Sequence, residues 1–321
     1  MNQDTQAAAP AATPAAPAAP ATPATPAAAP APTLTFAPVR CDDAALALYG
    51  QLFAACFPGT EKFTPAYLRW LYADNPDGGV AGYDAWDGER LAAHYVCVPG
   101  LATIGGQEVR VLLSLNTATH PDYQGKGLFT KLAALTYDSA REQGYDAVYG
   151  VANANSTPGF IRKLGFQLVR PLEARVGVGG VGTPPHGQGV AASFERVRSP
   201  AALAWRCANP DNPVRMLRHG ALWRFDAAAL PLTRAYGELA LPAAAAPALA
   251  QVAAATDGAW APARLYLGLV PDAERRFTGY PTIPTRLRPS PLNLIYRSLS
   301  GRVAQLDPAA IRFSFLDFDA Y

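Results

Sequence analysis

The stretch SLNTATHPDYQGKGLFTKL, residues 114–132, decides the fold, because it passes from a strand through a loop into a helix. The helix is indicated by an apolar side that begins at Leu128 and by Gly144, which suits a helix end. Gly125 and Gly127 let the loop backbone approach a ligand closely, and N–H groups at a helix start favour an anion. The stretch therefore predicts a diphosphate-binding loop, although glycine-rich turns are also common without any ligand.

The segments on both sides of this stretch predict strands and helices in alternation. A strand signal at 34–36 precedes a helix that Asp42 or Asp43 caps, and Thr64-Pro65 marks a second helix start. Three strand-like stretches follow, separated by glycine-containing turns: Val80 to Trp86, Leu91 to Val98, and Val109 to Thr119. Beyond the loop the patterns predict a strand over 145–151, a helix over 156–164 and a strand over 166–169.

Two sequence motifs in this part of the chain resemble those of the GNAT superfamily of acyl-CoA-dependent N-acyltransferases. The first is PDYQGKGLF, residues 121–129, which carries the proline, glutamine and first glycine of the family motif, with Lys126 adding a positive charge. The second is NANSTPGFIRKLGF, residues 153–166, in which asparagines end a strand and a short helix closes with Lys-Leu-Gly-Phe. The chain departs from the family at Phe129, where the motif has Gly or Ala. The resemblance covers about residues 34–170.

The resemblance implies a mixed α/β (α+β) fold with a central, largely antiparallel sheet, and acetyl-CoA as the co-substrate. In this family an amine attacks the acetyl carbonyl directly, and a backbone N–H of the strand at 116–119 stabilises the oxyanion. The edge of this strand pairs with pantetheine, and the gap toward 145–153 admits the thioester. The residues that the resemblance places around acetyl-CoA are Thr117, Ala118, Thr119, Gln124, Gly125, Lys126, Gly127, Leu128, Phe129, Thr130, Asn153, Asn155 and Phe160.

The groups that exchange protons are less clearly marked. Ile161 stands where many family members have a tyrosine acid, so that acid is missing. His120 and His94 are candidate bases because the histidine pKa suits this role, although turn-closing or packed histidines are common alternatives. Carboxylates at the end of the sequence are further candidates: the terminal carboxylate of Tyr321 and the side chains of Asp317 and Asp319. An amine that arrives neutral, or that loses its proton to water, needs no such base.

The composition divides the chain into four parts. Residues 1–33 are an Ala/Pro-rich tail, with fifteen alanines in the first 32 residues, and this predicts a disordered spacer. Residues 34–170 form the predicted GNAT domain, and 171–192 a linker rich in Gly, Val and Pro. Residues 193–321 are predicted to form a second, degenerate GNAT-like α/β module that supplies acceptor specificity.

A weak repeat supports this second module. Residues 69–76 and 205–210 share a Trp followed by Asn-Pro, although the spacing differs by one residue and chance similarity stays open. One active unit with a degenerate companion resembles the N-acetyltransferases of nucleotide-linked amino sugars. The resemblance thus implies a small-molecule amine acceptor, and a nucleotide-linked amino sugar leads the candidates. A protein lysine acetyltransferase and a non-catalytic acetyl-CoA-binding module are the alternatives.

Charge, hydropathy and cysteine content argue against a nucleic-acid binder, a membrane-spanning protein, and a disulfide-bonded or zinc-binding protein. A net charge of +2 argues against a sequence-independent nucleic-acid binder, and the Ala-rich runs are too weakly apolar and too often broken by proline to span a membrane. The four cysteines, Cys41, Cys56, Cys97 and Cys207, show neither disulfide nor zinc spacing. With no signal-peptide pattern, this predicts a cytoplasmic protein without a metal. The oligomeric state stays open.

Overall fold

The computed structural model describes residues 33–256, 263–288 and 290–319, and the chain from Leu34 onward forms one compact unit. The predicted disordered tail lies outside the described residues except for Thr33. The elements up to residue 177 are β1 (Leu34–Pro38), α1 (Asp43–Cys56), α2 (Pro65–Tyr72), β2 (Ala81–Asp87), β3 (Arg90–Ile104), β4 (Gln107–Thr119), the 3-10 helix η1 (Pro121–Tyr123), α3 (Leu128–Glu142), β5 (Ala147–Ala152), α4 (Thr157–Leu164), β6 (Gln167–Pro171) and β7 (Glu173–Gly177).

The elements from residue 194 onward continue the mixture of strands and short helices. They are β8 (Phe194–Val197), α5 (Pro200–Cys207), β9 (Arg215–His219), β10 (Leu222–Ala228), β11 (Thr233–Leu239), η2 (Ala243–Ala245), α6 (Ala246–Ala254), β12 (Ala263–Leu269), η3 (Asp272–Glu274), η4 (Thr285–Leu287), β13 (Asn293–Ser298), β14 (Ile311–Ser314) and η5 (Phe315–Asp317). Within the described ranges, no helix is both long and apolar enough to cross a membrane.

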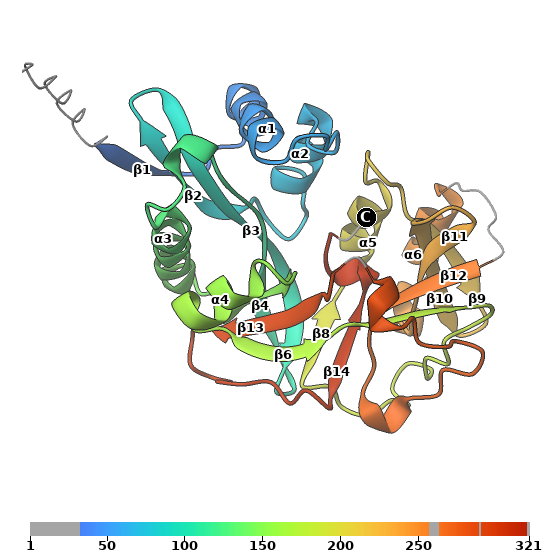
Figure 1. The fold of residues 1–321 in the computed structure, drawn as a ribbon. Coiled ribbons are helices and arrows are strands. Elements are labelled where there is room, and N and C mark those ends of the chain that lie inside the picture. The colour runs from blue at the N-terminus through green and yellow to red at the C-terminus, as the bar shows by residue number, and fades with distance from the viewer. Residues whose placement is uncertain (1–32, 257–262, 289, 320–321) are drawn as a thin grey trace, which may run out of the picture. The chain divides into compact units, whose positions relative to one another are not determined.

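The strands of the described residues form a 14-stranded sheet, whose main path runs β6-β13-β5-β4-β3-β8-β14-β12-β11-β10-β9 (Figure 1). The pairs β4–β5, β11–β12 and β8–β14 are parallel, and the other pairs are antiparallel. The predicted mixed, largely antiparallel sheet is therefore confirmed.

Helices cover both faces of the sheet formed by the first half of the chain. One core packs α1 and α2 against β3 and β4 through residues such as Leu52, Leu68 and Leu113. A second core packs α3 and α4 against the opposite face of the same strands through residues such as Leu132 and Leu112. Because neighbouring strand residues point to opposite faces, Leu112 and Leu113 belong to different cores.

The helix starts are encoded locally, as the sequence predicts. The Asp42 side chain caps α1 by accepting a hydrogen bond from the Ala45 backbone N–H, at 3.0 Å. Thr64 caps α2 in the same way, with Pro65 in the first turn, and Ser199-Pro200 repeats this arrangement at α5. The residue types at a helix start thus fix where each of these helices begins.

Strand β3 is longer than predicted, because Pro99 does not end it. The pairing of β3 with β2 stops at Cys97, and its pairing with β8 starts at Leu101. Pro99 therefore lies where β3 has no strand partner on that edge, while Leu112 of β4 is opposite it on the other edge. A proline costs no ladder hydrogen bond at such a position.

Two strands connect the first and second parts of the sequence in the sheet. β13 lies between β5 and β6 and pairs antiparallel with both. Reciprocally, β7 lies within the predicted linker 171–192 and pairs antiparallel with β12. Each part of the chain thus contributes a strand beside those of the other, and the predicted domain boundaries stay a prediction.

Candidate functional site

The predicted diphosphate-binding loop lies at the start of α3. Gly125 and Gly127 are exposed and have left-handed backbone conformations, with φ of 76° and 73°. A Cβ atom at either position would meet no other group within 4 Å, so the backbone conformation, and not a lack of space, favours glycine. Gly127 is the N-cap of α3 and has no side chain to cap it. The first N–H groups of α3 are consequently placed to bind an anion.

Contacts with β2 and β4 hold this loop at the sheet. The Tyr123 hydroxyl donates to Asp87 Oδ2 at 2.6 Å, and Gln124 Nε2 donates to the Thr119 carbonyl at 3.4 Å. Lys126 Nζ lies 4.7 Å from the centre of the Tyr123 ring, so its positive charge stays beside the loop. The loop therefore combines exposed backbone N–H groups with one cation.

Strands β4 and β5 separate before β4 reaches this loop. Their parallel pairing runs from Val111 with Ala147 to Ser114 with Gly150 and goes no further. β5 remains paired with β13 as far as Ala152, and β4 remains paired with β3 to Thr119. Residues 115–119 thus have no strand partner on the β5 side among the described residues. The pairing of pantetheine with the edge at Thr117, Ala118 and Thr119 stays a prediction.

A bulge in β4 coincides with the point of separation. The register of β4 against β3 shifts between the pair His94–Ala118 and the pair Val96–Leu115. Asn116 lies in this interval with a left-handed φ of 48°. A residue in this conformation re-aims the backbone of an edge strand, as in bulges beside active sites.

Polar side chains on the α3 face fix the last residue of the β4–β5 pairing. Ser114 Oγ lies 2.7 Å from Tyr95 Oη, which lies 2.5 Å from Tyr137 Oη. Burial raises the pKa of both tyrosines well above the usual range, so both keep their protons. Burial also raises the pKa of the nearby Cys97 thiol to about 12, and this thiol is therefore not a ready nucleophile.

His94 is fully buried on the opposite face. Its Nδ1 lies 2.7 Å from Asp84 Oδ1, and its Nε2 lies 3.0 Å from Tyr72 Oη. Both ring nitrogens are therefore engaged within the protein. Sequence reasoning selected His94 but missed its partners, because Tyr72 is on α2 and Asp84 is on β2.

His120 closes the turn after β4. Its Nδ1 accepts a hydrogen bond from the Asp122 N–H at 3.2 Å and so caps η1. Arg90 Nη2 lies 3.1 Å from His120 Nε2 and 2.7 Å from Asp122 Oδ2. The hydrogen bond from Arg90 lowers the pKa of the exposed Asp122 carboxyl. The structure thus gives His120 the turn-closing contacts that the sequence analysis weighed against a catalytic role.

The second sequence motif lies at the end of β5. Asn153 Oδ1 accepts from the N–H groups of Asn155 and Ser156, at 3.0 and 2.9 Å, and orders the turn before α4. Phe160 of α4 is buried, and its ring lies edge-on to Phe129 with 5.2 Å between ring centres. Phe129, which departs from the family motif, therefore packs α3 against α4.

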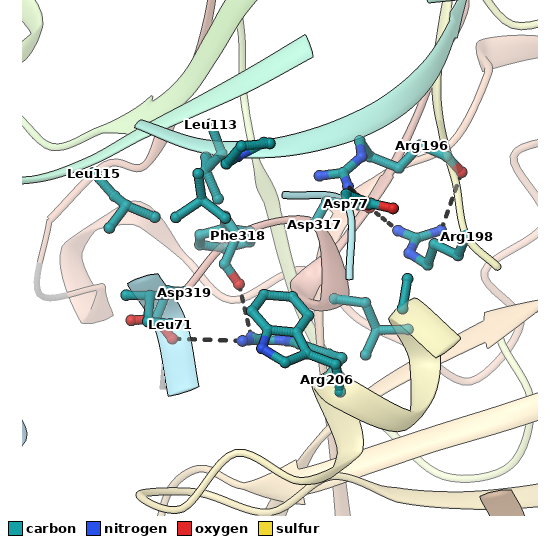
Figure 2. A pocket seen from close by; sticks show the side chains of 15 residues that line it. Leu71, Asp77, Leu113, Leu115, Arg196, Arg198, Arg206, Asp317, Phe318 and Asp319 are labelled. Carbon is teal, nitrogen blue, oxygen red and sulfur yellow. Dashed lines mark hydrogen bonds and ion pairs between the residues drawn. The ribbon is translucent and has the colours of Figure 1, made fainter. Parts of the chain in front are cut away.

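A cavity lies on the α1/α2 side of the sheet, where β4 approaches the last described residues (Figure 2). Leu113 and Leu115 of β4 line it, together with Leu71 of α2 and Trp205 of α5. Leu115 is the first β4 residue beyond the pairing with β5. The cavity therefore begins where the two strands separate.

Charged side chains from distant segments surround this cavity: Asp77, Arg196, Arg198, Arg206, Asp317 and Asp319 (Figure 2). Asp319 accepts from the Tyr67 hydroxyl and pairs with Lys62 at 2.7 Å and with Arg206 at 3.6 Å. Arg198 pairs with Asp317, whose other oxygen accepts from the Ser314 N–H at 2.7 Å. Sequence reasoning named the two terminal aspartates but missed the arginines, because no motif links them. Tyr321 lies outside the described residues.

No group of His, Cys, Asp or Glu among the described residues has an arrangement that could hold a metal ion. Ile161, at the position of the missing tyrosine acid, is partly buried beside the core of α3 and α4.

Residues 42–169 match the acetyltransferase (GNAT) domain. No curated protein matches the chain.

Solved structures resemble the chain over most of its length. A GCN5-related N-acetyltransferase from Anabaena variabilis is 13% identical with a TM-score of 0.55, covering 83% of this chain and 73% of its own. Eis1 from Mycobacterium abscessus is 12% identical with a TM-score of 0.52, covering 88% and 82%. A probable N-acyltransferase from Enterococcus faecalis is 10% identical with a TM-score of 0.52, covering 84% and 73%. The similarity in fold extends well beyond residues 42–169.

Proposed function

Because residues 42–169 form an acetyltransferase domain of the GNAT family, we propose that this chain transfers the acetyl group of acetyl-CoA to the primary amine of a small molecule. The observation that carries this proposal is that the glycine loop follows the segment of β4 that has left β5. One end of this arrangement suits a diphosphate, and the other is open for a thioester. The family match and the similar solved structures confirm the predicted GNAT-type fold and enzyme class, and the acceptor and the residues that bind acetyl-CoA are the proposed part.

In this proposal the loop and the edge of β4 hold acetyl-CoA. The diphosphate binds to the backbone N–H groups at 125–130 and to Lys126, and pantetheine pairs with the edge at 117–119. The acetyl carbonyl then lies at the bulge, where a backbone N–H of 116–119 stabilises the oxyanion as the amine attacks. Asn153, Asn155 and Phe160 are the proposed contacts on the β5 side of acetyl-CoA.

We place the acceptor in the cavity on the α1/α2 side. Asp77 and Asp319 line this cavity, where each is paired with an arginine, and Leu115 connects the cavity to the bulge. Trp205 and Arg206 also line this cavity, with Trp205 stacked on Trp70 and Arg206 paired with Asp319. The nucleotide-linked amino sugar therefore rests on the sequence resemblance alone. The attacking amine loses its proton to water, because both predicted histidine bases are engaged in contacts within the protein.

The proposal is tested by measuring thiol release from acetyl-CoA with nucleotide-linked amino sugars, free amino sugars, diamines and lysine peptides as acceptors. Turnover with a small amine supports it, and the best substrate identifies the acceptor class. Turnover with lysine peptides alone favours protein acetylation, and CoA binding without turnover favours a non-catalytic module. His120→Asn is expected to change kcat by less than about threefold, since His120 caps a turn.

A further inference from the structure

Asn116 has a backbone conformation that needs support. In the described part of the chain, Asn116 and Leu232 are the non-glycine residues with positive φ. A left-handed conformation costs a non-glycine residue about 1 kcal/mol, and asparagine tolerates it better than most. At Asn116 this conformation sets the direction of the β4 backbone where the strand leaves β5.

The Asn116 side chain is tied to a hydrogen-bond chain that ends on a carboxylate. Asn116 Nδ2 donates to Tyr72 Oη at 3.3 Å, and Tyr72 Oη lies 3.0 Å from His94 Nε2. His94 Nδ1 lies 2.7 Å from Asp84 Oδ1, and the Tyr49 hydroxyl donates to Asp84 Oδ2 at 2.8 Å. Every member of this series is satisfied when Asn116 donates to Tyr72, Tyr72 donates to His94, and His94 donates to Asp84.

Burial makes this series of hydrogen-bonded side chains rigid. Tyr49, Tyr72 and His94 are each 0% exposed, and Asp84 is 1% exposed. Asp84 and His94 are directly opposite each other in the β2–β3 pairing. The His94 ring lies 4.2 Å from the Tyr49 ring and 5.7 Å from the Tyr72 ring, measured between centres. Because these four side chains are buried, breaking a link among them would leave a polar group unsatisfied, which costs about 1–3 kcal/mol.

We infer that Tyr72, His94 and Asp84 are positioning residues that hold Asn116 in its left-handed conformation and thereby keep the bulge in the form that receives the thioester carbonyl. The structural part of this inference stands on the contacts above, and its catalytic part rests on the proposed function. Burial keeps the Tyr72 hydroxyl protonated by raising its pKa well above the usual range, so Tyr72 remains a donor to His94. His94 thus acts through Asn116 and need not touch the substrate.

A double-mutant cycle with two readouts tests this inference. The variants are Tyr72→Phe, Asn116→Gly and the double variant, because glycine adopts the left-handed conformation without a tether. The matched control is Tyr296→Phe, which removes the hydroxyl of another buried tyrosine, on β13. This hydroxyl donates to the Val303 carbonyl oxygen at 2.8 Å. The readouts are hydrogen exchange of the backbone amides at 115–119 and thiol release from acetyl-CoA with the best acceptor.

Tyr72→Phe is expected to speed exchange at 115–119 about tenfold and to lower kcat about tenfold, with KM for acetyl-CoA unchanged, since the hydrogen bonds to Asn116 and His94 are both lost. In the Asn116→Gly background the same change should matter less than about threefold. Tyr296→Phe should alter neither readout.

Unchanged exchange in Tyr72→Phe overturns the inference, as does an equally large effect in the Asn116→Gly background. Faster exchange with an unchanged kcat overturns its catalytic part. If the wild-type chain turns over no acceptor, the proposed function fails, while exchange still decides whether Tyr72 holds the bulge.

Discussion

At Asp77, beside the cavity, burial and a neighbouring positive charge shift the carboxyl pKa in opposite directions. The Asp77 side chain is 14% exposed, and the nearest cation is Arg196, with 3.8 Å between Nη2 and Oδ2. Burial raises the pKa of the Asp77 carboxyl, and Arg196 only partly offsets this effect. The ionised carboxylate therefore costs folding free energy. Residues kept at such a cost are common where a ligand is bound, in keeping with the proposed acceptor site.

Asp77→Asn should consequently make stability less dependent on pH. The folded chain keeps the Asp77 proton to higher pH than the unfolded chain, so this residue lowers stability as pH rises through and above 3.8, the ordinary value. The variant should be more stable than wild type at neutral pH, and this advantage should vanish below the ordinary pKa. Urea unfolding at several pH values measures the difference, and a variant less stable at neutral pH would contradict it.

Among the helices, α2 and α5 form a nearly symmetric pair. The Trp70 and Trp205 rings stack with 4.8 Å between centres, and each indole N–H donates to the other residue's carbonyl at 2.8 Å. Asn75 and Asn209, which follow these helices, are both buried and accept from the N–H two residues on. The weak sequence repeat thus corresponds to matching contacts, which supports the proposed second module.

The symmetry of the tryptophan pair predicts coupled energetics. Trp70→Phe and Trp205→Phe should each cost about 1–3 kcal/mol, through one lost hydrogen bond and a smaller ring. The double variant should cost less than the sum by about 0.5 kcal/mol or more, because the two residues share their contacts. Chemical denaturation of the four proteins tests this, and strict additivity would show that the pair does not act as a unit.

Elements with local signals could be predicted from the sequence, and elements that depend on distant strands could not. The caps at Asp42 and Thr64 and the glycines at 125 and 127 act within a few residues, so α1, α2 and the loop were predictable. The extension of β3 through Pro99 depends on where β2 and β8 end along it, which no local pattern reveals. The partners of His94 were hidden for the same reason.

At the scale of the whole molecule, the two parts of the sequence depend on each other through exchanged strands. β13 pairs with β5 from Asn293–Ala152 to Ser298–Ala147, and it also pairs with β6. The cavity likewise combines β4 with arginines and aspartates from residues 196–319. Both features join segments far apart in the sequence, so they could not be predicted from local motifs or from hydrophobic periodicity.

The first part of the chain should therefore be unable to fold alone. A fragment of residues 34–192 lacks β13, which leaves β5 and β6 with unpaired edges and an exposed apolar core. Circular dichroism should show no cooperative thermal transition for this fragment, in contrast to residues 34–321. A cooperative transition at a similar temperature would show that β13 is dispensable.

The binding of coenzyme A to the glycine loop tests the central claim most directly. Calorimetry should show that wild type binds CoA and that Gly127→Asp weakens binding about 100-fold or more, because its carboxylate would face the diphosphate. Gly144→Asp is the matched control, since Gly144 has a φ of 79°, is exposed, and lies beyond the opposite end of α3. It should bind CoA like wild type. Equal affinity in wild type and Gly127→Asp, or an equal loss in both variants, would contradict the account.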